Sequence, residues 1–216
     1  MQGVYPAKYR DRNGEVATSL KTDGKTLRLV VRGVEFTGKD FDSLDPVVNT
    51  PPEALASFAL HQGSLYSCAI EFDMPIPVVG AGSDLGLLHV RISLGEPVSS
   101  GCLDYRVELD LELGEAHFLS SGKHGEFEGE LLDLQGQLPD GTYLKTCFNC
   151  AFSDYSPLGR ASFGDLACFR DNKDQYREVS SKGDLFRIWK TMTEYVQETW
   201  LCPEFERRRP GAGYRG

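Results

Sequence analysis

The chain has 216 residues, of which 40% are hydrophobic and 25% are charged, and this composition excludes a wholly disordered chain or a fibrous repeat. Its net charge of −9 is concentrated between residues 41 and 141, which hold 17 of the 32 acidic residues and three of the 23 basic ones. Because such a surface repels phosphate backbones, we expect no nucleic-acid partner. Three consecutive arginines at 207–209 precede Pro-Gly-Ala-Gly, and we interpret residues 206–216 as a flexible tail.

The first residues give no sign of secretion or membrane insertion. Residues 1–12 already carry four charged side chains, and no stretch of the chain approaches the roughly 20 apolar residues of a membrane span. We therefore expect a cytoplasmic protein without a membrane partner. Thiols stay reduced in that compartment, so the six cysteines indicate metal binding or simple burial before disulfide bonds.

The N-terminal forty residues are typical of a β-meander. Asn13-Gly14 and Asp23-Gly24 supply the positive φ angles of tight hairpin turns. They separate three expected strands, at 4–10, 15–21 and 26–36. A proline-containing loop at 40–52 and a short helical segment at 53–61 follow.

Alternation of apolar and polar residues is the clearest signal in the sequence. It runs without interruption from Leu103 to Leu113, and shorter stretches show it at 88–94 and 126–131. Strands with one apolar face bury that face against another layer, so we predict antiparallel sheets packed face to face. The expected fold is mainly β (α+β), with an antiparallel β-sandwich over residues 1–141.

The sequence pattern changes after residue 141. Strand-like segments at 143–152 and 161–169 are followed by a short helix at 172–179. Ser181 then caps a predicted long helix whose apolar stripe runs as far as Val196, and we expect this helix to end against Pro203, just after Cys202. We expect residues 142–205 to form a region whose C-terminal helix packs on the sandwich, so that the two make one compact unit.

Four cysteines of this region fit a zinc site: Cys147, Cys150, Cys168 and Cys202. The C-x2-C pair forms the tight knuckle common in structural zinc sites, although the last interval of 33 residues matches no standard finger. Four thiolates leave no open coordination position, so the expected Zn²⁺ is structural and would clip the region together. Redox chemistry at the C-x2-C pair, or cysteines without a ligand or in disulfides, are the alternatives. Cys68 and Cys102 are interpreted as small buried apolar residues.

Three segments resemble a family of uncharacterised bacterial proteins of unknown function. They are CFNCAFSDYSP at 147–157, FGDLACFR at 163–170 and VQETWLCPEF at 196–205. The resemblance implies a bacterial source and supports the four cysteines as one unit. It implies no activity.

Other candidate chemistry is weaker. The loop from Ser153 to Arg160 has a good turn sequence, and a binding edge is the alternative. The histidines His89, His117 and His124 lie on or near neighbouring strands, but their spacing assigns them no roles. Acidic faces at 108–112 and 126–130 would repel each other if the strands were adjacent. Solvation explains such faces most simply, and docking of a basic partner is the alternative.

The sequence therefore favours a non-enzymatic interaction protein, comparable to immunity proteins and adaptors, with an acidic face for a basic protein partner and a structural zinc. The alternative is an enzyme or small-ligand-binding protein with a pocket between the sandwich and the C-terminal helix, around Asp154, Tyr155 and Arg160. A structural part of a larger bacterial assembly is a third hypothesis. The sequence makes no prediction of the oligomeric state.

Overall fold

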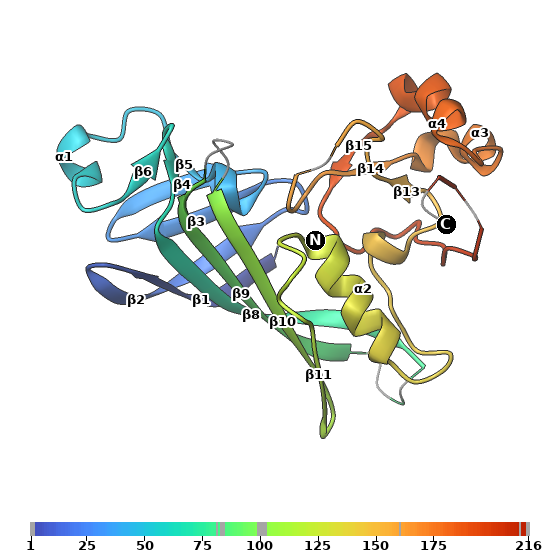
Figure 1. Cartoon of the computed structure of the whole chain (residues 1–216), viewed down its shortest axis with the longest axis horizontal. Coiled ribbons are helices and arrows are strands. Elements are labelled where there is room, and N and C mark those ends of the chain that lie inside the picture. Colours follow the sequence, from blue (N-terminus) through green and yellow to red (C-terminus); the bar gives the residue numbers. More distant parts are fainter. Residues whose placement is uncertain are drawn as a thin grey trace.

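A computed structural model describes residues 3–80, 82, 85–98, 103–159, 161–211 and 213–214, and Figure 1 shows the whole chain. Most of its strands belong to one antiparallel sheet of ten, in the order β11-β10-β9-β8-β1-β2-β3-β4-β5, with β12 beside β8. The strands of this sheet are β1 (Gly3–Asp11), β2 (Gly14–Thr22), β3 (Leu27–Val31), β4 (Val34–Gly38), β5 (Asp45–Pro46), β8 (Cys68–Val79), β9 (Leu85–Pro97), β10 (Leu103–Leu113), β11 (Ala116–Leu119) and β12 (Tyr143–Leu144).

The smaller elements pack next to the sheet or belong to the C-terminal region (Figure 1). The elements next to the sheet are η1 (Phe41–Ser43), α1 (Pro52–Leu55), β6 (Leu60–His61), β7 (Ser64–Leu65) and α2 (Phe127–Gln137). The C-terminal elements are η2 (Cys147–Asn149), β13 (Ser153–Asp154), β14 (Leu166–Cys168), η3 (Arg170–Asn172), α3 (Lys173–Arg177), α4 (Lys182–Ile188), η4 (Trp189–Thr191) and β15 (Glu194–Val196). None of the helices in the described ranges is long and apolar enough to cross a membrane.

The predictions of a mainly β fold and of both N-terminal hairpins are confirmed, but the prediction of a sandwich of two sheets is wrong. Strand β8 pairs with β1 on one side and β9 on the other, so that Ile70 lies opposite both Tyr9 and Ile92. The two sheets expected from the sequence are thus one continuous sheet. Alternation shows which face of a strand is buried, but it does not show which strands pair.

One face of the sheet carries the main core. The inward residues of β8 are fully or nearly buried along its whole length, as are those of β3 and most of β9 and β10. Three aromatic rings from other elements cover this face: Phe127 lies 6.0 Å from Phe41 and 4.3 Å from Phe163 between ring centroids. The opposite face of β8, β9 and β10 remains open to solvent.

The segment predicted as a third one-sided strand, at 126–131, is the start of helix α2. Its buried side chains Phe127, Leu131 and Leu134 are spaced as on one helix face. Glu130 is fully buried and accepts hydrogen bonds from the backbone N–H groups of Gly122 and His124, both at 2.8 Å. An alternation of six residues is too short to distinguish the two periods.

The prediction of a long C-terminal helix is also wrong. Helix α4 begins after the predicted cap Ser181, ends at Ile188 and is followed by the single turn η4. Residues Glu194–Val196 then form β15, which pairs with β14 so that Tyr195 lies opposite Ala167. Pairing with β14 satisfies the backbone groups of this segment and outweighs the helical spacing of its apolar residues. Cys202 consequently lies in a loop.

The last residues contact the folded body. Arg207 forms an isolated bridge with Cys150, and the backbone N–H of Arg208 donates to the carbonyl of Asn149 at 2.8 Å. Further along, the N–H of Tyr214 donates to the carboxylate of Asp154 at 3.0 Å. The boundaries at 141 and 205 and the flexible tail stay predictions.

Candidate functional site

The C-x2-C pair forms a tight turn in η2. The N–H of Cys150 donates to the carbonyl of Cys147 at 3.1 Å, and the N–H of Cys147 donates to the carbonyl of Trp200 at 2.6 Å. The hydroxyl of Ser153 donates to the carbonyls of both cysteines, at 2.7 and 3.1 Å. These bonds fix the turn next to the loop that carries Cys202.

The structure brings the other two cysteines to this turn. Cys168 ends β14 and lies opposite Ser153 in the small sheet. The Arg170 guanidinium approaches its sulfur at 3.8 Å. All four thiols are buried, and Cys147 forms a side-chain hydrogen bond with Cys202. We call Cys147, Cys150, Cys168 and Cys202 the cysteine cluster.

Backbone N–H groups point at three of these sulfurs. The donors are the N–H groups of Phe152 toward Cys150, of Arg170 toward Cys168 and of Glu204 toward Cys202, each two residues after its cysteine. The hydrogen bond from Cys147 lowers the pKa of Cys202 to about 6. Burial raises the pKa values of Cys150 and Cys168, while the bond to Cys202, followed by burial, raises that of Cys147. One sulfur therefore carries negative charge more readily than its neighbours.

The cluster does not have the geometry of a formed metal centre. In the described part of the chain, no three His, Cys, Asp or Glu side chains are grouped so that they could hold a metal ion. The zinc clip predicted as part of the fold is accordingly not seen. All four cysteines are free, as is the buried Cys68 of the main core. Cys102 lies outside the described residues.

The loop predicted as a turn or binding edge begins inside the protein. Ser153 and Asp154 form β13 and are buried, and Tyr155 is buried as well. The carboxylate of Asp154 accepts a hydrogen bond from the Tyr176 hydroxyl at 3.0 Å. These contacts connect the small sheet to α3. Because Ser153 and Asp154 are buried, β13 presents no solvent-exposed side chain for a binding edge. Arg160 lies outside the described residues.

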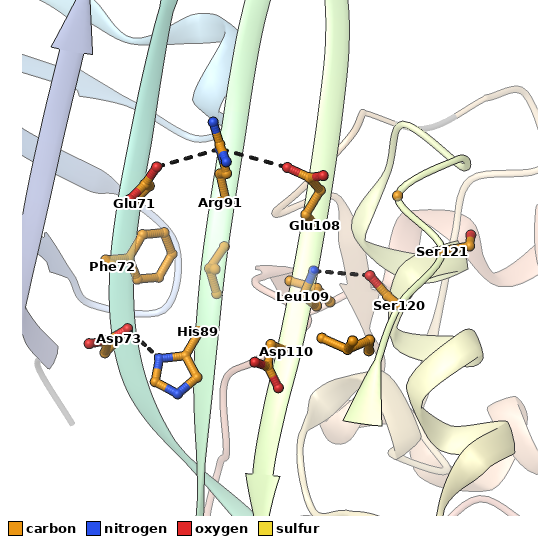
Figure 2. Close-up of a pocket in the computed structure, with 13 residues that line it drawn as sticks. Glu71, Phe72, Asp73, His89, Arg91, Glu108, Leu109, Asp110, Ser120 and Ser121 are labelled. Carbon is orange, nitrogen blue, oxygen red and sulfur yellow. Dashed lines mark hydrogen bonds and ion pairs between the residues drawn. The ribbon is translucent and has the colours of Figure 1, made fainter. Parts of the chain in front are cut away.

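A second candidate site lies on the open face of the main sheet. Two rows of charged side chains cross β8, β9 and β10 (Figure 2). In one row, Arg91 lies between Glu71 at 3.4 Å and Glu108 at 3.7 Å. In the next row, His89 lies opposite both Asp73 and Asp110.

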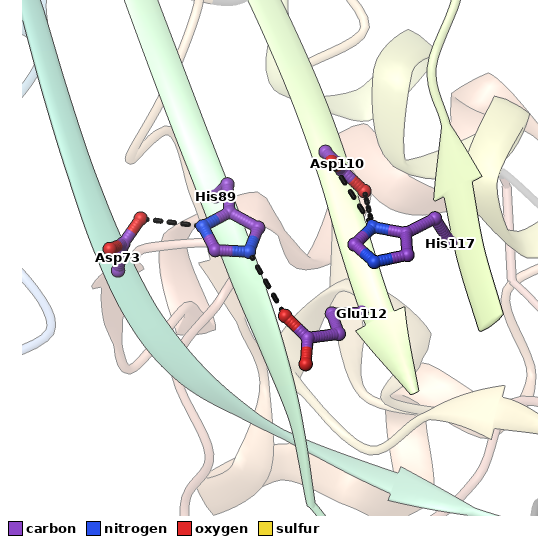
Figure 3. A network of polar contacts seen from close by, with 5 residues as sticks. All are labelled: Asp73, His89, Asp110, Glu112 and His117. Carbon is purple, nitrogen blue, oxygen red and sulfur yellow. Dashed lines mark hydrogen bonds and ion pairs between the residues drawn. The ribbon is translucent and has the colours of Figure 1, made fainter. Parts of the chain in front are cut away.

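Both ring nitrogens of His89 face carboxylates (Figure 3). Nδ1 lies 2.7 Å from Asp73, and Nε2 lies 3.5 Å from Glu112. The hydrogen bond to Asp73 is the main reason that the pKa of His89 is raised. His117 pairs with Asp110 at 3.1 Å on the same face. His124 lies elsewhere and contacts Asp133 of α2 at 3.2 Å.

The two rows border an open hollow of about 550 Å³. Residues from β8, β9 and β10 form its floor, and the end of β11 with the segment after it, residues 119–122, forms one wall. We call the five carboxylates on this side of the sheet the acidic face: Glu71, Asp73, Glu108, Asp110 and Glu112. The acidic residues at 126–130 are not part of it, because α2 carries Glu128 and Glu130 into the interior.

Comparison with known proteins shows the family of the chain. The profile of DUF6304, described as a family of unknown function, matches residues 3–153. The chain belongs to the DUF6304 family. The resemblance predicted from the sequence is thereby confirmed, and no curated protein or solved structure matches the chain.

The DUF6304 match covers the main sheet, including the whole acidic face, and α2. It ends at residue 153, within the first of the three segments that suggested the resemblance. Of the cysteine cluster, Cys147 and Cys150 lie inside the matched range, whereas Cys168 and Cys202 lie beyond it. The family match thus gives no support for the cluster as a unit.

A buried pair of carboxylates in this DUF6304 protein escaped the sequence analysis. Asp40 accepts a hydrogen bond from the N–H of Phe163 at 3.0 Å, and Glu198 accepts one from the N–H of Gly164 at 2.8 Å. Glu198 also accepts a bond from the Tyr155 hydroxyl at 3.0 Å. Burial, followed by repulsion from Asp42, raises the pKa of Asp40 to about 7. No sequence signal links two acidic residues so far apart in the chain.

Proposed function

We propose that the protein is a non-enzymatic interaction module that binds a basic protein segment on its acidic face and holds its C-terminal region with a structural zinc. The observation that carries the proposal is the convergence of carboxylates from β8 and β10 on one open hollow, which Glu71, Asp73, Glu108 and Asp110 line, with Glu112 of the acidic face close by. Lysine and arginine side chains complement such a surface, and the long-range attraction accelerates their association.

The charges within the face support recognition of a cation. Arg91 and His89 offset part of the negative charge, but five carboxylates surround these two groups and His117. The side chains of Asp73 and Glu108 are about half exposed, at 58% and 46%, so an incoming ammonium or guanidinium group reaches them without displacing a buried partner. The concentration of negative charge in residues 41–141 is the sequence counterpart of this surface.

The contacts of the histidine favour binding over catalysis. A general base needs a ring nitrogen within hydrogen-bond reach of the proton that it takes. In His89 both nitrogens already face carboxylates, and the nearby Ser120 hydroxyl accepts a bond from the backbone N–H of Leu109 at 2.9 Å. For the alternative pocket, Asp154 and Tyr155 are buried with partners of their own.

A charge-neutralising variant tests the acidic face. Glu71→Gln, Glu108→Gln and Asp110→Asn together should weaken binding of a short polylysine peptide by about tenfold at low salt. The matched control neutralises three exposed acidic residues elsewhere, namely Glu15, Glu53 and Asp174. Fluorescence anisotropy of the labelled peptide measures the affinity of each variant. Equal weakening in the two variants would show attraction by net charge alone and would remove the proposed site.

Four observations support zinc at the cysteine cluster. Four buried free thiols lie together, and backbone N–H groups point at three of the sulfurs, an arrangement that stabilises thiolates. Structural zinc commonly takes four thiolates, two of them from C-x2-C. The surrounding region also has only small cores, which metals often reinforce. On binding, the thiols would turn toward a common centre.

Metal analysis tests this part of the proposal. Protein purified from a reducing compartment such as the cytoplasm, which we propose as its location, should hold about one zinc per chain. Cys168→Ser should lose the metal. Cys68→Ser, which alters a cysteine of the main core, is the matched control and should retain it. Zinc-free wild-type protein with four thiols that react freely in the native state would contradict the proposal.

A further inference from the structure

The arginines at 207–209 lie against the knuckle of the cysteine cluster. The N–H of Ala151 donates to the carbonyl of Glu206 at 2.7 Å, and Arg207 bridges Cys150. The N–H of Arg208 donates to the carbonyl of Asn149 at 2.8 Å. The backbone that carries Arg207 and Arg209 is therefore held on both sides of the knuckle.

The side chains of Arg207 and Arg209 line two adjoining hollows of about 740 and 310 Å³. The larger hollow falls in the range of about 300–1,000 Å³ that small-molecule sites occupy. Tyr143 and Asn149 line its wall, and the Arg207 guanidinium lies 4.0 Å from the centre of the Tyr143 ring. Because the two hollows share these arginines, we treat them as one site and call it the basic hollow.

The local charge is positive although the protein is acidic. The one carboxylate that lines both hollows belongs to Glu206, which lies 3.5 Å from Lys173 and 3.7 Å from Arg177. Among the residues that the structure describes, Arg207 and Arg209 form no ion pair with a carboxylate. Two guanidinium groups thus face the hollow while their charge is not neutralised by the described residues.

We propose that the basic hollow binds a small phosphate-bearing anion. The planar guanidinium fork matches the oxygens of a phosphate group and donates two parallel hydrogen bonds to it. The Tyr143 ring holds the Arg207 side chain over the hollow, which reduces the entropy lost on binding.

The charge of the whole molecule favours a small anion over a nucleic acid. A long polyanion would extend beyond the basic hollow and meet a protein with a net charge of −9. A small phosphate compound experiences mainly the local field of the two arginines. This ligand is distinct from the basic partner proposed for the acidic face, so either proposal stands if the other fails.

Calorimetric titration with inorganic pyrophosphate tests the proposal on the full chain. The wild-type protein should bind it with measurable heat, and Arg209→Gln should weaken the affinity by about tenfold. The Arg209 side chain forms no hydrogen bond, ion pair or ring contact within the described ranges, and Arg207→Gln provides a second, independent variant. Arg12→Gln, at the exposed β1–β2 turn, removes the same charge elsewhere and should bind as the wild type does.

Three results would overturn the inference. They are the absence of pyrophosphate binding by the wild-type protein, equal weakening in Arg12→Gln and Arg209→Gln, and unchanged affinity in both hollow variants. Citrate serves as a tricarboxylate comparison at the same salt concentration. If citrate bound as tightly as pyrophosphate, the site would be a general anion site and the assignment to phosphate would be wrong.

Discussion

The main sheet and the C-terminal region are stabilised by different means. The main core contains 33 buried residues drawn from the described chain, whereas the two clusters of the C-terminal region contain seven and five. The C-terminal helices are short as well, since α3 has five residues and α4 has seven. Helices of this length are marginal by themselves.

This difference gives the cysteine cluster a physical purpose. Cys150 belongs to one of the small cores, and Cys147 and Cys168 belong to the other. A small core seldom supplies enough buried apolar area to offset its conformational entropy, and a metal or disulfide then supplies the rest. The sheet needs no such support. The following predictions test this contrast, from the largest expected effect to the smallest.

Removing the metal should loosen the C-terminal region and leave the sheet folded. If zinc is bound, a chelator or Cys168→Ser removes an apparent binding energy on the order of 10 kcal/mol for a structural zinc site. Hydrogen exchange should then rise sharply in β13, β14, β15 and α4 and change little in β8–β10. Cys68→Ser is the control. If hydrogen exchange rose equally in the main sheet and in the C-terminal region, both would depend on the cysteine cluster to the same extent.

Phe127→Ala should destabilise the main core. Phe127 is fully buried between the rings of Phe41 and Phe163, so the free energy of unfolding should fall by about 3–5 kcal/mol. Chemical denaturation measures the loss. Leu132→Ala, on the exposed side of the same helix, should change it by about 0.5 kcal/mol or less. A small loss in Phe127→Ala would mean that α2 contributes little to the core.

The carboxylate pair between sheet and C-terminal region should make stability depend on pH. Burial raises the pKa of Asp40 from 3.8 to about 7, so the folded state favours the protonated form. The contribution of Asp40 to the free energy of unfolding is therefore largest below pH 3.8. It falls by up to about 4 kcal/mol as the pH rises toward 7. Repulsion from Asp42 and Glu198 adds to the shift, whereas hydrogen bonds from the N–H groups of Phe163 and Phe41 oppose it.

Denaturation curves between pH 5 and pH 8 measure this dependence. The stability difference between wild type and Asp40→Asn should fall through that interval, because the variant lacks the titrating group. Asp174→Asn, at a fully exposed position of α3, should give a difference that does not vary with pH. A flat difference for Asp40→Asn would show that this carboxyl titrates in its ordinary range.

The smallest effect should appear at His89. Its hydrogen bond to Asp73 raises its pKa above 6.5, so the ring is charged at mildly acidic pH and offsets the acidic face. Binding of the polylysine peptide should therefore strengthen about two- to fivefold as pH rises through that pKa. His89→Gln should reduce this dependence, while His124→Gln, away from the face, should keep it. An unchanged profile in His89→Gln would exclude the ring from the response.

Local chemistry explains which parts of the fold were predictable. Asn13-Gly14 requires a tight turn wherever it lies, and the hairpin β1–β2 follows from it. The alternation of β10 determines that Val107, Leu109 and Leu111 face the core. By contrast, the short pattern at 126–131 fits either period, and only packing against Phe41 and Phe163 places Phe127 on a helix.

The site was predictable to a similar degree. Spacing grouped the four cysteines, and the structure brings their side chains together, but the metal itself stays a prediction. Alternation indicated that Glu108, Asp110 and Glu112 share one exposed face. It gave no sign that His89 would lie between Asp73 and Glu112, because strand register determines that position. The basic hollow was missed because the arginines at 207–209 were taken for a tail.

The sequence by itself determined the β-rich class, the first two hairpins, the burial pattern of the long strands and the acidic character of their open face. Each follows from interactions between residues close in the chain, namely turn geometry and the period of two. Only the tertiary structure decided that the strands form one sheet, that Glu194–Val196 pairs as β15, and that Asp40 lies near Glu198. These outcomes depend on which distant segments satisfy each other's backbone and buried groups, and no local pattern encodes that choice.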